Sequence, residues 1–414
     1  MEQSLENLPV DETFFEPALR LLRHYCRHRR DTPSLSDERF VRESLRRVLG
    51  HWDSGRDFLQ ARQEDGEDLA RATWFGGLHS RRRADLVAEV ATRSYELFDR
   101  FLQPRDWLQE FPELAGRAVW AVDGHQIEHA SHAARDRKDE LVSVGLLYGL
   151  CLHSGLQRAL LPFQGDGVRR HEWPVFKQHL PNWLAQDRGG LLPIVIGDPA
   201  YIDVLFWFEQ KRRRQAVIIT REKENMKPLI IGPNGFDPQD PVNRGVETDE
   251  LAGYTDAPLR RIVYRDPLSG ERFVFLTTET TLRPGLIALL YFLRWKIEKV
   301  FDVAKNKLHQ QKAWANGDTA AHLQAHCIAL THNLLTLLLA TLEQAGVREL
   351  KVERKHAARR KACPKAKRVP AQEMVRHAAQ LTCQFIRLVR YYLDHKTPWR
   401  IALPRFQLRL EAYL

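Results

Sequence analysis

Two aspartates in the sequence follow short apolar runs, which predict buried strands. Asp123 follows the run RAVWAV at 117–122, and Asp198 stands two residues after the run LLPIVI at 191–196. In open α/β sheets, side chains at the carboxyl ends of strands point into the crevice where sites form. A carboxylate there must be hydrogen-bonded, paired with a cation or bound to a metal to offset its desolvation. Each aspartate alone is typical of a turn or helix cap, but two in this setting favour a site.

Four further residues share one stripe of a helix that we expect at 285–308. Tyr291, Arg294, Glu298 and Lys305 stand at offsets of 0, 3, 7 and 14 residues. At about 100° per residue they project within a stripe only about 60° wide, and apolar positions flank that stripe. A solvated pair of Arg294 and Glu298 is the alternative, and it would contribute only about 0.3 kcal/mol. The pattern therefore favours a functional face beside the core.

Strands and helices alternate around these residues. The sequence predicts strands at 142–152 and 156–163 joined by a turn, a helix at 202–211, a strand at 216–220 and a second long helix at 320–344. Such alternation is typical of an α/β sheet covered by helices on both faces. We therefore predict an α/β core at 106–221 and 285–345.

The first 105 residues are expected to be helical, with amphipathic segments at 14–28, 36–52 and 69–101. Within them, residues 67–83 loosely resemble a helix-turn-helix, with a turn at Gly76 and Gly77 and a basic helix that carries Arg81, Arg82 and Arg83. The alternative is a basic solvated helix face. We predict a helical DNA-binding region at 1–105.

Residues 222–284 carry seven prolines among glycines, including Pro228, Pro233, Pro238, Pro241 and Pro258. A hairpin is predicted from 259–264 and 272–278 around the turn residues at 267–270. We expect this segment to be a small β-rich insertion and not a continuation of the main sheet.

Positive charge is concentrated near the C-terminus. The chain carries a formal net charge of +10, and residues 348–370 hold ten Lys or Arg against two Glu, or +8. A local surplus of this size favours a polyanionic partner. We predict a basic linker and helical region at 346–414, whose last helix, at 371–395, packs on its own chain in preference to a partner.

Several classes of protein are excluded by the sequence. No apolar run approaches the roughly 18–20 residues of a membrane span, and the N-terminus lacks the apolar core of a signal peptide. The five cysteines are scattered without paired spacing, which argues against disulfides or a zinc knuckle and fits a reducing compartment. We expect a cytoplasmic protein without membrane association.

The spacing Y-x2-R-x3-E-x6-K of the helical stripe resembles the signature of the transposases grouped under insertion sequence four, in the DDE superfamily. Asp123 in VDGH and Asp198 in GDPAY stand where that family has its first two acids, and the β-rich segment stands where its members carry an inserted domain. The resemblance covers roughly residues 115–345.

This resemblance implies an RNase H-like catalytic core interrupted by the insertion. It implies that Asp123, Asp198 and Glu298 hold two Mg2+ ions, for which Mn2+ can substitute, and that three carboxylates suit such hard cations. Arg294 and Lys305 would neutralise DNA phosphate, and the Tyr291 hydroxyl would donate to a phosphate oxygen. The resemblance also makes Trp295 a candidate platform for a flipped base, with packing beneath the insertion as the alternative.

The implied activity is cut-and-paste transposition in a prokaryotic cytoplasm, at the nucleoid. The partners would be double-stranded DNA, as terminal inverted repeats and as target, bound by a homodimer. The alternatives are a catalytically inactive DNA-binding protein derived from a transposase, and an RNase H-like nuclease.

Two smaller choices concern the residues near this stripe. Helical geometry lets either Glu298 or Asp302 reach a metal, but the longer side chain and the signature both favour Glu298. His125 is a weaker candidate as a metal ligand. We expect His309, Lys312 and Trp314 to shape a loop or to contact the DNA backbone.

The basic segment generates a first prediction. If its cations contact phosphates, neutralising four of them should reduce the slope of log K against log salt by about 3–4. The loss of affinity should be similar for specific and random DNA, as measured by fluorescence anisotropy over a salt series. An unchanged slope would assign the segment to a solvated face or a protein contact.

Overall fold

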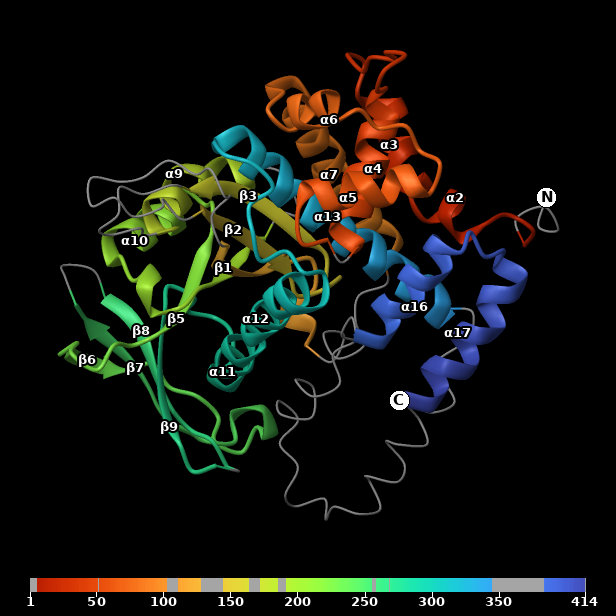
Figure 1. The fold of residues 1–414 in the computed structure, drawn as a ribbon. Helices are drawn as coiled ribbons and strands as arrows, with labels where there is room; N and C mark the ends of the chain where they lie inside the picture. The colour runs from red at the N-terminus through yellow and green to blue at the C-terminus, as the bar shows by residue number, and fades with distance from the viewer. Residues whose placement is uncertain are drawn as a thin grey trace.

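The computed structural model describes residues 6–50, 52–102, 111–127, 144–163, 172–184, 191–254, 258–267, 269–344 and 383–413. The basic segment at 348–370 and the first part of the predicted last helix lie outside the described residues. Helices, strands and one mixed sheet give the α/β class that the sequence predicts (Figure 1).

Within the described residues, the strands form one nine-stranded sheet in the order β3-β2-β1-β4-β5-β9-β8-β7-β6. The strands are β1 (Val119–Ile127), β2 (Val144–Cys151), β3 (Gln157–Phe163), β4 (Ile194–Ile196), β5 (Val217–Arg221), β6 (Leu229–Pro233), β7 (Val246–Gly253), β8 (Pro258–Arg265) and β9 (Arg272–Thr277). The pairs β1–β4 and β4–β5 are parallel, and all other neighbours are antiparallel. The predicted hairpins at β2–β3 and β8–β9 are confirmed.

Helices cover both faces of the sheet, as predicted. The Tyr148 hydroxyl donates to the carbonyl of Ala325 in α13 (Asp318–Gln344) on one face. The next residue, Gly149, faces Trp183 of α9 (Glu172–Leu184) on the other, where a Cβ would lie 2.5 Å from the indole. Glycine is therefore required here by the close approach of a helix.

The α-helices between β4 and α13 in the sequence pack against strands of the sheet. They are α10 (Val204–Arg212), α11 (Pro284–Leu293) and α12 (Trp295–Asp302), and a π-helical turn, η4 (Val303–Lys307), ends the last of them. Short 3-10 turns are found at η1 (Pro112–Leu114), η2 (Pro199–Tyr201) and η3 (Pro241–Asn243).

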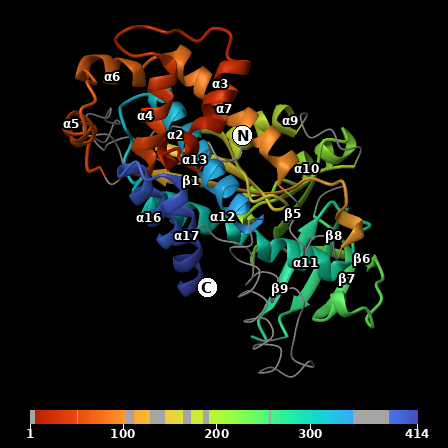
Figure 2. The ribbon, with the colours of Figure 1, turned by 90° about the vertical axis from the view of Figure 1, so that its right-hand side faces the viewer.

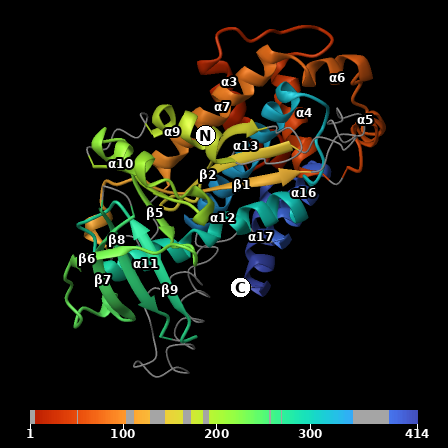
Figure 3. The same ribbon diagram turned by 90° about the vertical axis from the view of Figure 1, so that its left-hand side faces the viewer.

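The expectation that residues 222–284 form a unit apart from the main sheet is wrong. Strand β9 pairs with β5, with Ile219 opposite Thr277, so that β6–β9 extend the sheet (Figure 3). The Thr277 hydroxyl also donates to the Ile218 carbonyl at 2.8 Å. The physical reason is that β5 is the last parallel strand, and β9 satisfies the backbone groups that its edge would otherwise leave unpaired.

The N-terminal region is helical, as predicted, and consists of α2 (Val10–Phe14), α3 (Glu16–Tyr25), α4 (Asp37–Leu49), α5 (Gly55–Glu64), α6 (Arg71–Leu78) and α7 (Arg81–Phe101). The turn predicted at Gly76 and Gly77 lies instead at His79 and Ser80, where the Ser80 side chain caps α7. Gly77 lies inside α6. A Cβ at this position would lie 2.7 Å from the Phe40 ring, which explains the glycine.

The C-terminal helix α16 (Cys383–Asp394) packs against α2 and against α17 (Trp399–Tyr413) (Figure 2). Phe385, Val389 and Tyr392 of α16 are buried, and the Arg390 Nε donates to the Leu49 carbonyl. The described part of the last helix therefore packs on its own chain, as predicted.

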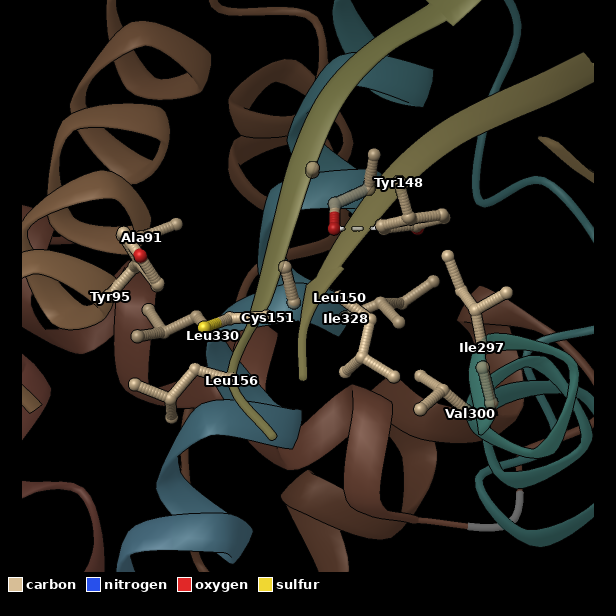
Figure 4. Packing of buried hydrophobic residues seen from close by; sticks show 14 of the residues in the cluster. Ala91, Tyr95, Tyr148, Leu150, Cys151, Leu156, Ile297, Val300, Ile328 and Leu330 are labelled. Atoms are coloured by element: carbon tan, nitrogen blue, oxygen red, sulfur yellow. Dashed lines mark hydrogen bonds between the residues drawn. The ribbon is translucent and has the colours of Figure 1, made fainter. Parts of the chain in front are cut away.

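Helix α13 is long and apolar enough to cross a membrane, but 72% of its most apolar window is buried inside the protein. Figure 4 shows Leu330 beside Cys151 and Leu156, and Ile328 beside Leu150 and Val300. Such burial is that of a core helix, which here joins the helical region to the sheet and to α12.

Gly149 provides a test of this packing. Gly149→Ala should lower the free energy of unfolding by about 1–3 kcal/mol, because the added methyl overpacks against Trp183. Gly232→Ala is the matched control, since a Cβ there meets nothing within 4 Å. Urea denaturation followed by tryptophan fluorescence measures both, and equal midpoints would contradict this account of the α9 interface.

Candidate functional site

The two aspartates occupy equivalent positions on neighbouring parallel strands. In the register of β1 with β4, Val119 pairs with Ile194 and Ala121 with Ile196. Asp123 and Asp198 each come two residues after the last of these pairs. Because neighbouring strands run about 4.8 Å apart, the backbone brings the two residues together at one level of the sheet.

Asp123 does not end its strand, contrary to the sequence prediction. β1 continues to Ile127 because β2 supplies a long antiparallel partner, with Asp123 opposite Tyr148. β4 stops at Ile196, so Asp123 extends past its parallel neighbour, and its side chain is 17% exposed. One carboxylate oxygen of Asp198 accepts from the Ala200 amide at 2.7 Å and caps η2. The alternative that Asp198 serves as a cap therefore holds for this oxygen.

Asp123 belongs to the face of the sheet that α12 covers. Side chains alternate along β1, so Asp123 and His125 share a face, and the His125 ring stacks on Phe301 of α12 at 5.0 Å. Tyr148, opposite Asp123, contacts the same Phe301 ring. Helix α12 is therefore the element that can bring further side chains to Asp123.

Arg294 joins this helix to the strand. Its Nη1 lies 3.3 Å from Asp123 Oδ2, and its Nη2 lies 2.9 Å from Glu298 Oε1. The Arg294 side chain is 12% exposed and that of Glu298 38%. Burial opposes the charge of Arg294, but Tyr291, Asp123 and Glu298 outweigh it and raise its pKa. The intrahelical pair considered from the sequence exists, and the same guanidinium also binds a catalytic candidate on another element.

Tyr291 is buried beside the same guanidinium. Its ring lies 5.1 Å from that of Phe275 on β9. Burial raises the pKa of Tyr291, with Arg294 and Arg221 opposing and Asp198 adding to the shift. The hydroxyl therefore stays protonated near neutral pH, within electrostatic reach of both Asp198 and Arg294.

The helix that carries these residues is less regular than predicted. The single helix expected at 285–308 is interrupted at Arg294, where the Arg294 amide bonds to the Tyr291 carbonyl and the Ile297 amide to the Arg294 carbonyl, both three residues apart. Its end, η4, is π-helical. A projection of Lys305 that assumes fourteen residues of regular α-helix therefore does not apply here.

Lys305 nevertheless acts on the same region. It is exposed on η4, and burial together with the charge of Lys305 lowers the pKa of His125 to about 4. His125 is thus a neutral, stacked side chain of the core beside the site. Its geometry supports packing on Phe301 over a role as a ligand.

Trp295 lies outside the core, next to Arg294. It is 53% exposed, and the Lys299 Nζ lies 4.4 Å from the ring centroid. The alternative that Trp295 packs beneath the insertion is therefore wrong. An exposed indole beside a basic cluster suits stacking on a planar partner.

Asp302 points to other partners. It accepts from Asn306 at 2.7 Å and pairs with Lys307 at 3.5 Å. In the segment after η4, Trp314 is buried and donates from Nε1 to Gln310 at 2.9 Å. The expectation that Trp314 shapes this loop is confirmed.

Two of the three predicted DNA-binding arginines on α7 form ion pairs with another helix of the same chain. Arg82 and Arg83 both pair with Asp37, a buried carboxylate at the start of α4. Arg83 is itself buried and also donates to the Leu35 carbonyl. A buried carboxylate needs such partners, so phosphate contact by Arg83 is corrected to a structural role. Arg81 remains exposed and forms a surface ion pair with Asp85.

No three His, Cys, Asp or Glu side chains of the described residues are grouped closely enough to hold a metal ion. The guanidinium of Arg294 lies between Asp123 and Glu298. The donor set itself, three carboxylates without softer ligands, suits Mg2+ or Mn2+. Asp123, Asp198 and Glu298 are the residues that would hold such ions.

One residue of this region was missed from the sequence. Arg221 ends β5, is exposed, and acts on the Tyr291 hydroxyl. Its signal was available, because it follows the buried run at 216–220 and so belongs to the same edge as Asp198.

Comparison with known families decides what this arrangement belongs to. Residues 116–334, just over half of the chain, match the family described as the transposase DDE domain. The chain belongs to the DDE transposase family. The matched segment contains both aspartates and Glu298, and the prediction of a DDE transposase is confirmed at this level.

The fold of this transposase is only distantly similar to that of a solved transposase structure. A cryo-EM structure of the piggyBac transposase synaptic complex with hairpin DNA gives a TM-score of 0.37 at 10% identity, over 95% of this chain and 82% of that one. No curated protein matches the sequence. The family assignment rests on residues 116–334 alone.

The pairing of Asp37 generates a prediction for the helical region. Arg83→Ala should lower the free energy of unfolding by about 2–3 kcal/mol, because it removes one of the two arginines that pair with the buried Asp37 and leaves the Leu35 carbonyl without its buried donor. Arg81→Ala should change it by less than about 0.5 kcal/mol, since its ion pair is exposed. Chemical denaturation distinguishes the two, and equal effects would refute the structural role of Arg83.

Proposed function

We propose that this transposase excises and joins DNA by cut-and-paste transposition, after binding the terminal inverted repeats of an insertion sequence. One observation carries the proposal. Asp123 and Asp198 each come two residues after the last registered pair of the parallel strands β1 and β4, and Glu298 on α12 is linked to Asp123 through Arg294. Three acids carried by separate elements of a DDE family segment are the residue set that such catalysis requires.

We further propose membership of the group called insertion sequence four, and an RNase H-like core. The signature residues Tyr291, Arg294 and Glu298 are close enough to influence one another, which supports the first. The block β3-β2-β1-β4-β5, with helices on both faces, supports the second. In this proposal, β6–β9 are an addition to that core.

The proposed cofactor is Mg2+, two ions held by Asp123, Asp198 and Glu298, with Mn2+ as a substitute. Such ions activate a water or a 3′-hydroxyl as nucleophile and stabilise the leaving oxygen in phosphodiester attack. All three ligands are oxygen donors, in keeping with the preference of these cations.

The remaining side chains would bind and orient the DNA. Arg294 offers a planar fork to a phosphate, and Lys305 offers an exposed point charge. Tyr291 stays protonated because burial raises its pKa, so its hydroxyl can donate to a phosphate oxygen. The exposed face of Trp295 would stack a base that has left the duplex.

The proposed partners are the terminal repeats and a target duplex. The helical region at 1–105 would read the repeat, with Arg81 as the exposed member of its arginine trio. The basic segment at 348–370 would contact phosphates. We propose a homodimer as the DNA-bound form and the prokaryotic cytoplasm as the location.

A supercoiled donor plasmid that carries the element tests the function. The wild-type protein with Mg2+ should release the element and join it to a target plasmid. Glu298→Gln should reduce cleavage at least about a thousandfold, a loss of roughly 4 kcal/mol in transition-state stabilisation. Asp302→Asn is the matched control, because it changes an acid on the same helix that pairs with Asn306 and Lys307; it should retain activity within about thirtyfold.

The other outcomes separate the alternatives. Nicking without joining would indicate an RNase H-like nuclease, and DNA binding without cleavage would indicate a transposase-derived binding protein. The reverse ranking of the two variants would move the third acid from Glu298 to Asp302.

A further inference from the structure

The guanidinium of Arg294 uses its two terminal nitrogens on two different carboxylates. Nη1 is 3.3 Å from Asp123 and Nη2 is 2.9 Å from Glu298, although these acids come from a strand and a helix 175 residues apart in sequence, since 298 − 123 = 175. A charge-assisted fork of this kind holds both acids and neutralises part of their charge. Arg294 therefore fixes how far apart the two acids stand.

This arrangement opposes a divalent ion at the same acids. A carboxylate oxygen that ligates Mg2+ approaches it to about 2.1 Å, and the oxygens bound to Arg294 would have to turn away from the guanidinium to do so. The positive guanidinium would also repel an ion placed between the two acids. Arg294 and a metal thus compete for Asp123 and Glu298.

Arg294 has an alternative partner when DNA is present. Its Nε is buried and has no hydrogen-bond partner among the described residues. A phosphate accepts two parallel hydrogen bonds from a guanidinium, so it could engage Nε together with one terminal nitrogen. Exposed cations lie in the same region, since Arg221 acts on Tyr291 and Lys305 on His125. They would favour a phosphate at this position.

We propose that Arg294 is a positioning residue that couples DNA binding to metal binding. Without phosphate, it bridges Asp123 and Glu298 and weakens their affinity for divalent ions. With a phosphate bound, its guanidinium turns to the phosphate and releases the two carboxylates. This inference rests on the proposed function, because it takes these acids as the metal ligands.

Thermodynamic linkage makes the coupling reciprocal. If DNA raises the affinity for the metal by a given factor, the metal raises the affinity for DNA by the same factor. The coupling is then a property of equilibrium binding and can be measured without any strand cleavage.

The test measures Mn2+ binding to the full chain by electron paramagnetic resonance, with and without a short DNA duplex at low salt. In the wild type, the duplex should tighten Mn2+ binding by about tenfold or more. Arg294→Gln should bind Mn2+ about tenfold tighter than wild type without DNA, and DNA should then change its affinity by less than about threefold. Calorimetry of the duplex with and without Mn2+ should return the same factors.

Two further variants keep the test decisive. Lys299→Gln removes one positive charge next to Glu298 but no bridge, because Lys299 lies over Trp295, and it should retain the wild-type coupling. Arg294→Lys keeps the charge without the fork, and it should also lose most of the coupling. It serves as well if the glutamine variant fails to fold.

The results distinguish this inference from the proposed function. Arg294 variants that bind Mn2+ no more tightly than wild type and retain the coupling would overturn the inference alone. Mn2+ binding that Asp198→Asn leaves unchanged, or no Mn2+ binding by the wild type with DNA, would overturn the metal site and the inference together. A plasmid assay without excision, beside intact coupling, would overturn only the transposition activity.

Discussion

Two carboxylates side by side on neighbouring parallel strands are the constraint that the surrounding structure must satisfy. Asp123 and Asp198 each follow the same registered pair of β1 and β4 by two residues, so two negative charges are brought to one part of the sheet and repel each other. The neighbourhood compensates with cations from separate elements: Arg294 from the α11–α12 junction, Arg221 from β5 and Lys305 from η4. A surface that carries both carboxylates and basic side chains suits the binding of metal cations and of phosphate.

The cations and Glu298 can take these positions only because apolar packing fixes α12. Ile297 and Val300 are buried against Leu150 of β2 and Ile328 of α13 (Figure 4). Glu298 lies between these two anchors in the sequence and so projects from a helix whose rotation is set by its apolar side. The orientation of Arg294 and Glu298 is therefore set by the burial of the apolar side of α12 in the core.

Much of this could be predicted from the sequence, because it depends on local patterns. The apolar runs before the aspartates and the turn residues of both hairpins specify strands whatever surrounds them. The spacing from Tyr291 to Glu298 is short enough that the interruption at Arg294 leaves these residues on one side. Over the longer distance to Lys305, the π-helical turn defeats any projection from regular geometry.

Partners distant in sequence were the part that could not be predicted. A run of three arginines looks the same whether it faces phosphate or a buried carboxylate, and only the fold brings Asp37 to Arg82 and Arg83. Likewise, prolines and glycines at 222–284 indicate turns but do not say that β9 will pair with β5. Local elements could therefore be predicted from the sequence more reliably than contacts between residues far apart in it.

The pairing of β9 with β5 also changes what the β-rich segment does. Phe275 of β9 packs against the Tyr291 ring at 5.1 Å and against Phe292 at 5.8 Å. These two aromatic residues lie in the last turn of α11, close to the junction at Arg294. Because the sheet extension supports that junction directly, the position of the Arg294 guanidinium depends on β9 as well as on β1. The segment at 222–284 is thus part of the support of the site, and a change that displaced β9 would reach Asp123 and Glu298 through Tyr291 and Arg294.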